Sequence, residues 1–333
     1  RFPGGLDAGA FLSSYWQSRP LLLPEARPGF ASPLNADELA GLACEDGVES
    51  RLVLERDGPR PWEVRHGPFE EADFGSLPES HWTLLVQDVD KHVPEVADWL
   101  DAFRFLPDWR VDDIMISYAE DAGSVGPHLD EYDVFLIQAE GRRRWLIDPR
   151  TAFDANLVPD LDLRILKDFT PREEHLVVPG DVLYLPPGVP HWGIAEGPCM
   201  TWSVGFRSAT WQELALAWSE YAAEHLLPRR RFRDPQPVAQ AHGGEIHPRA
   251  LEEVRTRLQK GLLDAPEALF REWFGRFVTE PKGHLQAAPV DEPVSPGAFH
   301  SALLGCHGLT RNGFTRMAFC RGADGDDLLF ANG

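Results

Sequence analysis

His128 and Asp130 are the residues of this chain whose types and spacing are best suited to holding a metal ion. They stand one residue apart, and on an extended chain the side chains of residues i and i+2 point to the same side, so both can contact one ion. His191 is the predicted third ligand, because it follows an apolar run and a Pro-rich turn. Two imidazoles and one carboxylate leave coordination positions open, as in the facial triad of non-haem Fe(II) oxygenases.

A His-x-Asp pair alone is common by chance, and the prediction depends on its combination with His191 inside one β-rich segment. His175 lies in another apolar run, directly after two glutamates, and we expect it to be structural. The same expectation holds for the remaining histidines, which lie before the β-rich segment or after it.

Three consecutive arginines, at 142–144, follow a predicted strand over 134–138 and begin the next, separate predicted strand. Such a charge run is ordinarily a solvated face. Alternation along a strand, however, turns Arg143 to the side opposite Arg142 and Arg144, so a single guanidinium can point inward. An inward arginine needs an anion, and a dicarboxylate could bind it through a bidentate pair.

The segments around these residues predict a mainly β fold with α additions. Residues 114–206 contain many short apolar or alternating runs bounded by Gly, Pro or Asp, which is typical of a sandwich or barrel. Before them, Asn35 and Glu38 have the spacing of a capping box. After them, helical periodicity predicts helices over 210–227, 247–263 and 266–278, followed by a Pro-rich linker over 281–296.

Composition limits the partners. The net charge of -21 argues against direct nucleic-acid binding and fits a basic protein partner or a salt-adapted surface. The 4 cysteines are widely spaced and predict neither a zinc site nor a disulfide framework. Without an apolar run long enough to cross a membrane or a secretory signal pattern, we expect a cytoplasmic protein that does not bind membranes.

The chain as a whole resembles the JmjC-type 2-oxoglutarate oxygenases, and within them the ribosomal oxygenase branch. The matching motifs occur in the same order along nearly the whole chain, at residues 15–20, 39–43, 66–69, 106–110, 126–133, 141–145, 186–188 and 203–207. The resemblance implies a double-stranded β-helix (the cupin/JmjC barrel), a helical dimerisation region and a partial C-terminal winged-helix-like module. We expect these parts to occupy residues 1–208, 209–280 and 281–333.

The resemblance also implies roles for individual residues. His128, Asp130 and His191 would hold Fe(II), and Arg143 would bind the distal carboxylate of 2-oxoglutarate. Ser117, Thr201 and Ser203 could contact this co-substrate, although Thr201 stands where close relatives carry an amide side chain. Dioxygen would be the second co-substrate, and Glu131, Tyr132 and Asp133, with Glu120 and Asp121 nearby, could contact a basic substrate.

The function implied is hydroxylation of an arginine side chain of ribosomal protein L sixteen by a homodimeric enzyme. One alternative is a JmjC oxygenase that acts on a histidine, asparagine or lysine of another protein. Two others are a metal-dependent cupin enzyme that does not consume 2-oxoglutarate and a non-catalytic cupin-like scaffold. A scaffold has no need of the triad together with an inward Arg143.

Overall fold

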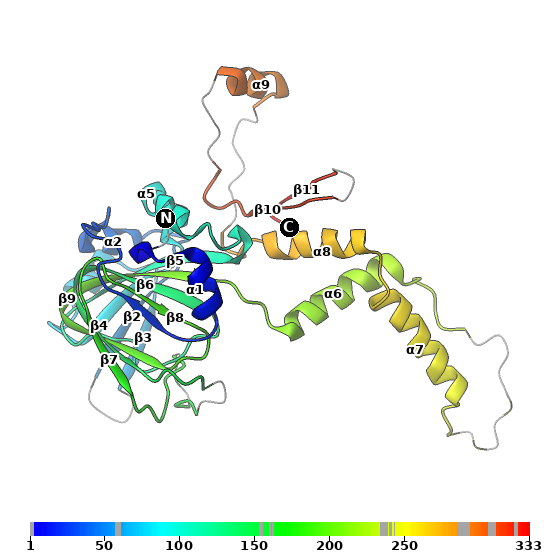
Figure 1. Ribbon diagram of the computed structural model, residues 1–333, viewed down its shortest axis with the longest axis horizontal. Helices are drawn as coiled ribbons and strands as arrows, with labels where there is room; N and C mark the ends of the chain where they lie inside the picture. The colour runs from blue at the N-terminus through cyan, green and yellow to red at the C-terminus, as the bar shows by residue number, and fades with distance from the viewer. Residues whose placement is uncertain are drawn as a thin grey trace. The chain divides into compact units, whose positions relative to one another are not determined.

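The short runs of apolar residues form one antiparallel sheet that wraps into a barrel (Figure 1). This computed structural model describes residues 3–56, 61–152, 156–159, 161, 163–233, 239, 242, 244–285, 294–305, 311–322 and 326–333. The strands are β1 (Leu21–Leu23), β2 (Ser50–Glu55), β3 (Trp62–His66), β4 (Trp82–Val86), β5 (Val111–Ala119), β6 (Asp133–Ile147), β7 (Glu173–Val177), β8 (Val182–Leu185) and β9 (His191–Phe206). Their order in the sheet is β1-β8-β6-β9-β5-β4-β2-β3, and β7 also pairs with β6.

The long strands β6 and β9 are neighbours inside the sheet, with further strands on either side of them. They pair with each other from Asp133 opposite Phe206 to Ile147 opposite His191. The other edge of β6 pairs with β8 along its first half and with β7 along its second half. The predicted double-stranded β-helix is therefore confirmed.

A bulge divides β6 into two halves, which the sequence pattern predicted as two separate strands. The register of its pairing with β9 shifts between Gln138 and Arg142. Gly141 lies within this stretch at φ 62, and a Cβ there would lie 2.0 Å from a backbone oxygen of Pro198, so only glycine fits. The strand continues through the irregularity because its pairing with β9 resumes beyond it. The prediction of a break was wrong.

The two faces of the sheet bury different sets of side chains. One face packs against the N-terminal elements and forms the larger core, which includes Phe11, Phe103, Phe135 and Trp202. The other face lines the barrel with a smaller cluster of Val134, Leu136, Trp145, Ile147, Val177, Leu183, Leu185 and Val189. Along β6 the members of the barrel cluster change from even to odd positions across the bulge, which places Arg143 in step with Trp145.

The helices of the barrel unit lie mostly before β5. They are α1 (Ala8–Ser14), α2 (Ala36–Leu42), α3 (Glu71–Gly75), α4 (Val89–His92), α5 (Pro94–Ala97), the 3-10 helices η1 (Pro3–Gly5), η2 (Asp98–Phe103) and η3 (Asp108–Arg110), and, much later, α9 (Pro296–Gly305). The predicted capping box at the start of α2 is present, with Asn35 accepting from the Glu38 backbone and Glu38 accepting from the Asn35 backbone.

The chain divides into two compact units, residues 1–208 with 282–315, and residues 209–281 with 316–333. The second unit contains α6 (Trp211–Leu226), α7 (Pro248–Leu262), α8 (Glu267–Thr279) and the hairpin of β10 (Met317–Cys320) and β11 (Leu328–Ala331). Trp218 on α6 packs against Trp273 on α8 with ring centroids 5.1 Å apart. None of the helices in the described part of the chain has the length and apolar character needed to cross a membrane.

Candidate active site

The three predicted metal ligands meet at the start of β9. His128 and His191 exchange two backbone hydrogen bonds, of 2.9 and 2.8 Å, which hold the two residues side by side. One potential ligand atom from each of His128, Asp130 and His191 lies within 4.8 Å of the others. The Nε2 of His191 lies 3.7 Å from the Oδ2 of Asp130.

Backbone carbonyls set the orientation of both imidazoles. The Nδ1 of His128 lies 2.9 Å from the carbonyl oxygen of Gly126, and the Nδ1 of His191 lies 2.9 Å from that of Val189. Because a carbonyl only accepts, each Nδ1 carries the proton, and each Nε2 keeps a lone pair for a metal. Burial, assisted by the neighbouring His128, lowers the pKa of His191 to about 4, so its imidazole is neutral at pH 7. This donor set fits Fe(II).

Arg143 is a buried cation with spare donors. Its side chain is 7% exposed, and its Nε and Nη2 have no hydrogen-bond partner among the described residues. Nη1 reaches Ser117 Oγ at 3.5 Å. A buried guanidinium without a counter-ion is costly, so this site fits an anion such as the carboxylate of 2-oxoglutarate.

Trp145, which sequence reasoning missed, contacts both Arg143 and the metal site. Its ring lies 5.9 Å from the Arg143 guanidinium carbon and 5.7 Å from the centroid of the His191 ring. Gly193, its partner across the β6–β9 pairing, makes room for the indole, because a Cβ there would lie 2.6 Å from the ring. The alternation that turned Arg143 inward could have identified Trp145 two residues later.

The three hydroxyl residues expected near the co-substrate are buried on neighbouring strands. Ser117 Oγ donates to the backbone oxygen of Thr201 at 3.3 Å. The Thr201 hydroxyl donates to Gln138 Oε1 at 3.0 Å. Ser203 is 8% exposed and lies opposite Leu136 of the barrel cluster. Thr201 thus has its proton committed to Gln138, and a role for it as a donor to the co-substrate would require that bond to change.

Asp133 has a structural environment. It is fully buried, and its carboxylate accepts from Tyr184 at 2.6 Å and from Gln17 at 3.0 Å, with Arg110 at 3.4 Å. These three partners occupy both oxygens, which argues against the substrate contact expected from the sequence. Spacing alone cannot show whether a carboxylate at the start of a strand contacts a substrate or has a structural role, because this depends on whether the carboxylate is buried.

The other acidic candidates differ in their partners. Glu131 forms an exposed ion pair with Arg164 at 2.9 Å. Glu120 accepts from the Tyr118 hydroxyl at 2.8 Å, and Asp121 accepts from the Gly197 backbone at 2.7 Å, so both have local structural partners.

Tyr132 is the aromatic candidate for contact with a substrate, and 43% of its surface is exposed. The nearby Asp130 carboxylate and then burial raise its pKa, so the phenol is neutral. Asp113, which the sequence did not single out, lies close by: a Cβ built on Gly205 would be 3.3 Å from Asp113 Oδ1 and 4.0 Å from Tyr132 Cε2. In the sequence Asp113, the third residue of β5, looks like an ordinary acid, and the pairing of β5 with β9 brings it near Tyr132.

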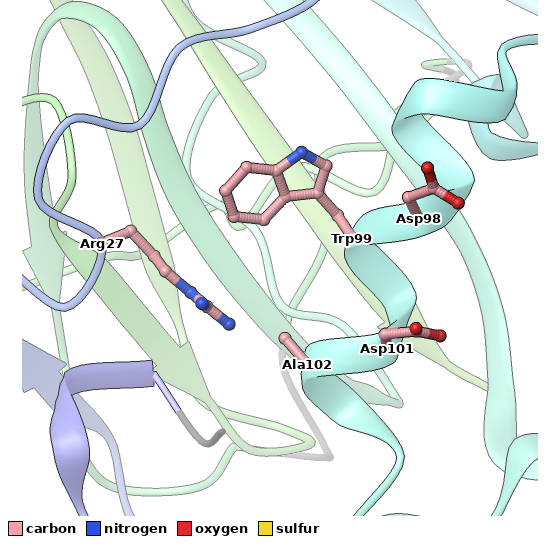
Figure 2. Close-up of a pocket in the computed structure, with 5 residues that line it drawn as sticks. All are labelled: Arg27, Asp98, Trp99, Asp101 and Ala102. Carbon is pink, nitrogen blue, oxygen red and sulfur yellow. The ribbon is translucent and has the colours of Figure 1, made fainter.

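A separate cleft of about 310 Å³ lies between the N-terminal loop and η2, and its lining includes none of the triad residues (Figure 2). Arg27 stacks over the Trp99 ring there, with its guanidinium carbon 5.4 Å from the ring centroid. Trp99 in turn packs on Phe30 at 4.4 Å. These contacts tie the loop to η2, and cation–π stacking accounts for them without a ligand.

Two family models match the chain. The JmjC domain model matches residues 98–214, and the ROXA-like winged helix model matches residues 257–333. The second match confirms the predicted C-terminal winged helix and includes α8, onto which the β10–β11 hairpin folds: a Cβ on Gly275 of α8 would lie 2.3 Å from the Phe330 ring.

Known proteins of the same kind are similar over most of the chain. The ribosomal protein uL16 3-hydroxylase of Escherichia coli is 40% identical over 97% of this chain and 83% of its own length. A probable ribosomal oxygenase of Haemophilus influenzae is 38% identical over 62% of this chain and 50% of its own length. The structure of the Escherichia coli ribosomal oxygenase YcfD with cobalt and 2-oxoglutarate has a TM-score of 0.85 at 37% identity, covering 100% of this chain and 86% of that one. The chain therefore belongs to the JmjC-domain ribosomal oxygenase family.

Proposed function

We propose that this chain is an Fe(II)- and 2-oxoglutarate-dependent hydroxylase that acts on an arginine side chain of the large-subunit ribosomal protein uL16. The observation that carries the proposal is the presence, in one barrel, of a metal-ligand triad and of a buried Arg143 with unused donors. The similarity to the Escherichia coli uL16 3-hydroxylase supports the choice of substrate.

The protein's own residues would prepare the site. His128, Asp130 and His191 would hold the iron on one side, and Arg143 with Ser117 would bind the distal carboxylate of the co-substrate. When bound, iron with 2-oxoglutarate and dioxygen supplies the oxidising power that inserts one oxygen atom into a C–H bond, with succinate and carbon dioxide as the by-products. The apolar barrel cluster would exclude bulk water around Arg143.

The surroundings of Tyr132 favour a cationic side chain. The carboxylates of Asp130, Asp113 and Asp112 raise the pKa of Tyr132, and Arg51 is the cation that opposes them, so three negative charges act there against one positive charge. A guanidinium could stack on the exposed phenol ring and pair with Asp113 Oδ1. The net charge of -21 would speed the approach of a basic ribosomal protein and disfavour RNA as the direct partner. Such a substrate implies a cytoplasmic reaction.

The test is mass spectrometry of a uL16 fragment incubated with the protein, Fe(II), 2-oxoglutarate and air. We expect one added oxygen atom on an arginine with the wild-type protein and with His175→Ala, a matched histidine that lies outside the triad. His128→Ala should add none. Oxygen on a histidine, asparagine or lysine would support the alternative JmjC substrates. Absence of both hydroxylation and succinate formation would contradict the proposal and favour the scaffold.

We also propose that the protein is a homodimer formed through its helical region. On α7, Leu251, Val254 and Leu258 follow one face of the helix and are 55%, 43% and 46% exposed. About half of the surface of each of these side chains is open in the described part of the chain. A second copy of the chain would bury this stripe.

A further inference from the structure

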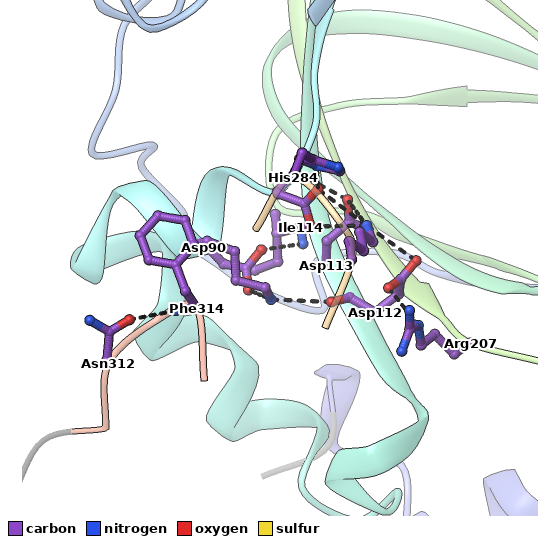
Figure 3. Close-up of polar contacts among 11 residues, drawn as sticks. Asp90, Asp112, Asp113, Ile114, Arg207, His284, Asn312 and Phe314 are labelled. Carbon is purple, nitrogen blue, oxygen red and sulfur yellow. Dashed lines mark hydrogen bonds and ion pairs between the residues drawn. The ribbon is translucent and has the colours of Figure 1, made fainter. Parts of the chain in front are cut away.

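A group of buried and half-buried acidic side chains, which includes Asp113, surrounds Lys282. The Nζ of Lys282 lies 2.9 and 3.2 Å from the two carboxylate oxygens of Asp88. It also lies 3.5 Å from Asp112 Oδ2 and 3.7 Å from Asp113 Oδ2. Figure 3 labels Asp112, Asp113 and His284 of this region, and its dashed lines mark polar contacts among the residues drawn. This part of the predicted linker is therefore anchored on the barrel.

The other charged groups of this cluster have partners of their own. Lys91 pairs with Asp90, and Asp90 accepts from the backbone of Ile114 at 2.7 Å. Arg207 Nε lies 3.2 Å from Asp112 Oδ1. His284 Nε2 lies 3.5 Å from Asp88 and 3.7 Å from Glu49. Within the described part of the chain, Lys282 is the one cation within 4.0 Å of the Asp113 carboxylate.

The two carboxylate oxygens of Asp113 have different surroundings. Its Oδ2 accepts from the Asp88 backbone at 3.1 Å and faces Lys282. Its Oδ1 faces Gly205, beside the ring of Tyr132. One carboxylate thus connects the Lys282 cluster with the surroundings of Tyr132, where the substrate is proposed to bind.

We propose that Lys282 is a positioning residue for substrate recognition, which keeps the Asp113 carboxylate negatively charged and in place beside Tyr132 so that it can bind a cationic side chain. The inference rests on the proposed function. Lys282 acts through Asp113 and does not itself contact the substrate.

The charge balance explains why the lysine is needed. Burial and the neighbouring Asp88, Asp112 and Asp90 carboxylates together raise the pKa of Asp113 to about 7, even though Lys282 lowers it. Without Lys282 the carboxyl group would be largely protonated at neutral pH. A neutral carboxyl group binds a guanidinium much more weakly than a carboxylate does.

The test measures binding of a fluorescent arginine-containing peptide without histidine to the metal- and 2-oxoglutarate-loaded protein in the absence of dioxygen, from about pH 6 to about pH 9. For the wild type, affinity should fall as the pH drops through about 7, because Asp113 becomes protonated. For Lys282→Gln this fall should begin at a higher pH. If the pKa rises by one unit, the ionised fraction and the affinity at neutral pH decrease roughly fivefold.

Two further variants make the result specific. Lys282→Arg should restore the wild-type pH profile, because it keeps the charge. Asp112→Asn removes a like charge and should move the fall in affinity to lower pH, and it tests the inference even if Lys282→Gln does not fold. Asp113→Asn should bind weakly at every pH.

The outcomes separate the two proposals. If the wild type shows the pH-dependent binding and neither Lys282→Gln nor Asp112→Asn moves it, the role of Lys282 is refuted while the proposed substrate class stands. If the wild-type protein binds the peptide no better above pH 7 than below it, the cationic substrate site and the inference both fail. Opposite shifts in the two variants support the inference.

Discussion

At the scale of the residue, the guanidinium of Arg143 is a buried positive charge without a counter-ion in the described part of the chain. Arg143 is buried with two unused nitrogen donors, and its one described hydrogen bond, to Ser117, is long at 3.5 Å. An arrangement of this kind is unfavourable for the ligand-free protein and favourable for an incoming carboxylate. The cost in stability and the gain in binding therefore have the same origin.

Arg143→Gln should weaken binding of 2-oxoglutarate by about 100-fold, because two charge-assisted hydrogen bonds are lost. The melting temperature of the ligand-free variant should equal or exceed that of the wild type, since an uncompensated buried charge is removed. Calorimetric titration and thermal unfolding measure the two effects. Arg143→Lys is the control, and it should recover little affinity because an ammonium lacks the planar fork. A large loss of stability in Arg143→Gln would contradict this account.

Spacing along the chain identified those site residues whose orientation depends only on their neighbours in the sequence. The His128–Asp130 pair and the inward Arg143 follow from alternation along extended segments, and His191 follows from its turn. Asp113 and the structural role of Asp133 could not be predicted in this way. Their surroundings come from β9 and from Tyr184, which are distant in sequence, and the sequence pattern carries no record of that packing.

At the scale of the element, the β6–β9 pair positions the site. The capping box of α2 and the N-cap of α6 at Thr210 depend on residues within four positions, and this local information made the helices predictable. The continuity of β6 was not predictable, since a glycine at φ 62 resembles a turn when its pairing partner is unknown.

Gly193→Ala should disturb both stability and metal binding. The added Cβ would lie 2.6 Å from the Trp145 ring, and overpacking of this kind costs about 1–3 kcal/mol. The displaced indole contacts His191, so the affinity for Co(II) should also decrease. Denaturant unfolding and metal titration measure these effects.

Gly41→Ala is the matched control, because Gly41 lies in α2 with no atom within 4 Å of an added Cβ. It should leave metal binding unchanged and stabilise the protein by about 0.5–1 kcal/mol at most. If the two variants had the same free energy of unfolding and the same affinity for Co(II), the contact with Trp145 would contribute to neither property.

At the scale of the whole molecule, the acidic charge and the exposed apolar stripe lie on different units of the chain. The acidic barrel unit is suited to a basic substrate, whereas the stripe on α7 is suited to another copy of the chain. The sequence indicated helices in this region, but periodicity does not reveal whether an apolar face packs within the chain or against a partner.

Leu258→Glu should convert a dimer into monomers, because it buries an unpaired carboxylate in the proposed contact. Size-exclusion chromatography with light scattering gives the mass directly. Thr256→Glu adds the same charge at an exposed position off the stripe, and should remain dimeric. A wild-type protein with the mass of one chain would refute the dimer.

The paired backbone hydrogen bonds between His128 and His191 have a consequence for how quickly a metal ion enters and leaves. Two of the three ligands are fastened to each other by the main chain whether or not an ion is present. Asp130 is held by one backbone hydrogen bond, in which its oxygen accepts from Gly188. Its side chain has more freedom to move, because it is 23% exposed. The ion should therefore enter and leave by rotation of the Asp130 carboxylate about its side-chain bonds, while the two imidazoles keep their positions.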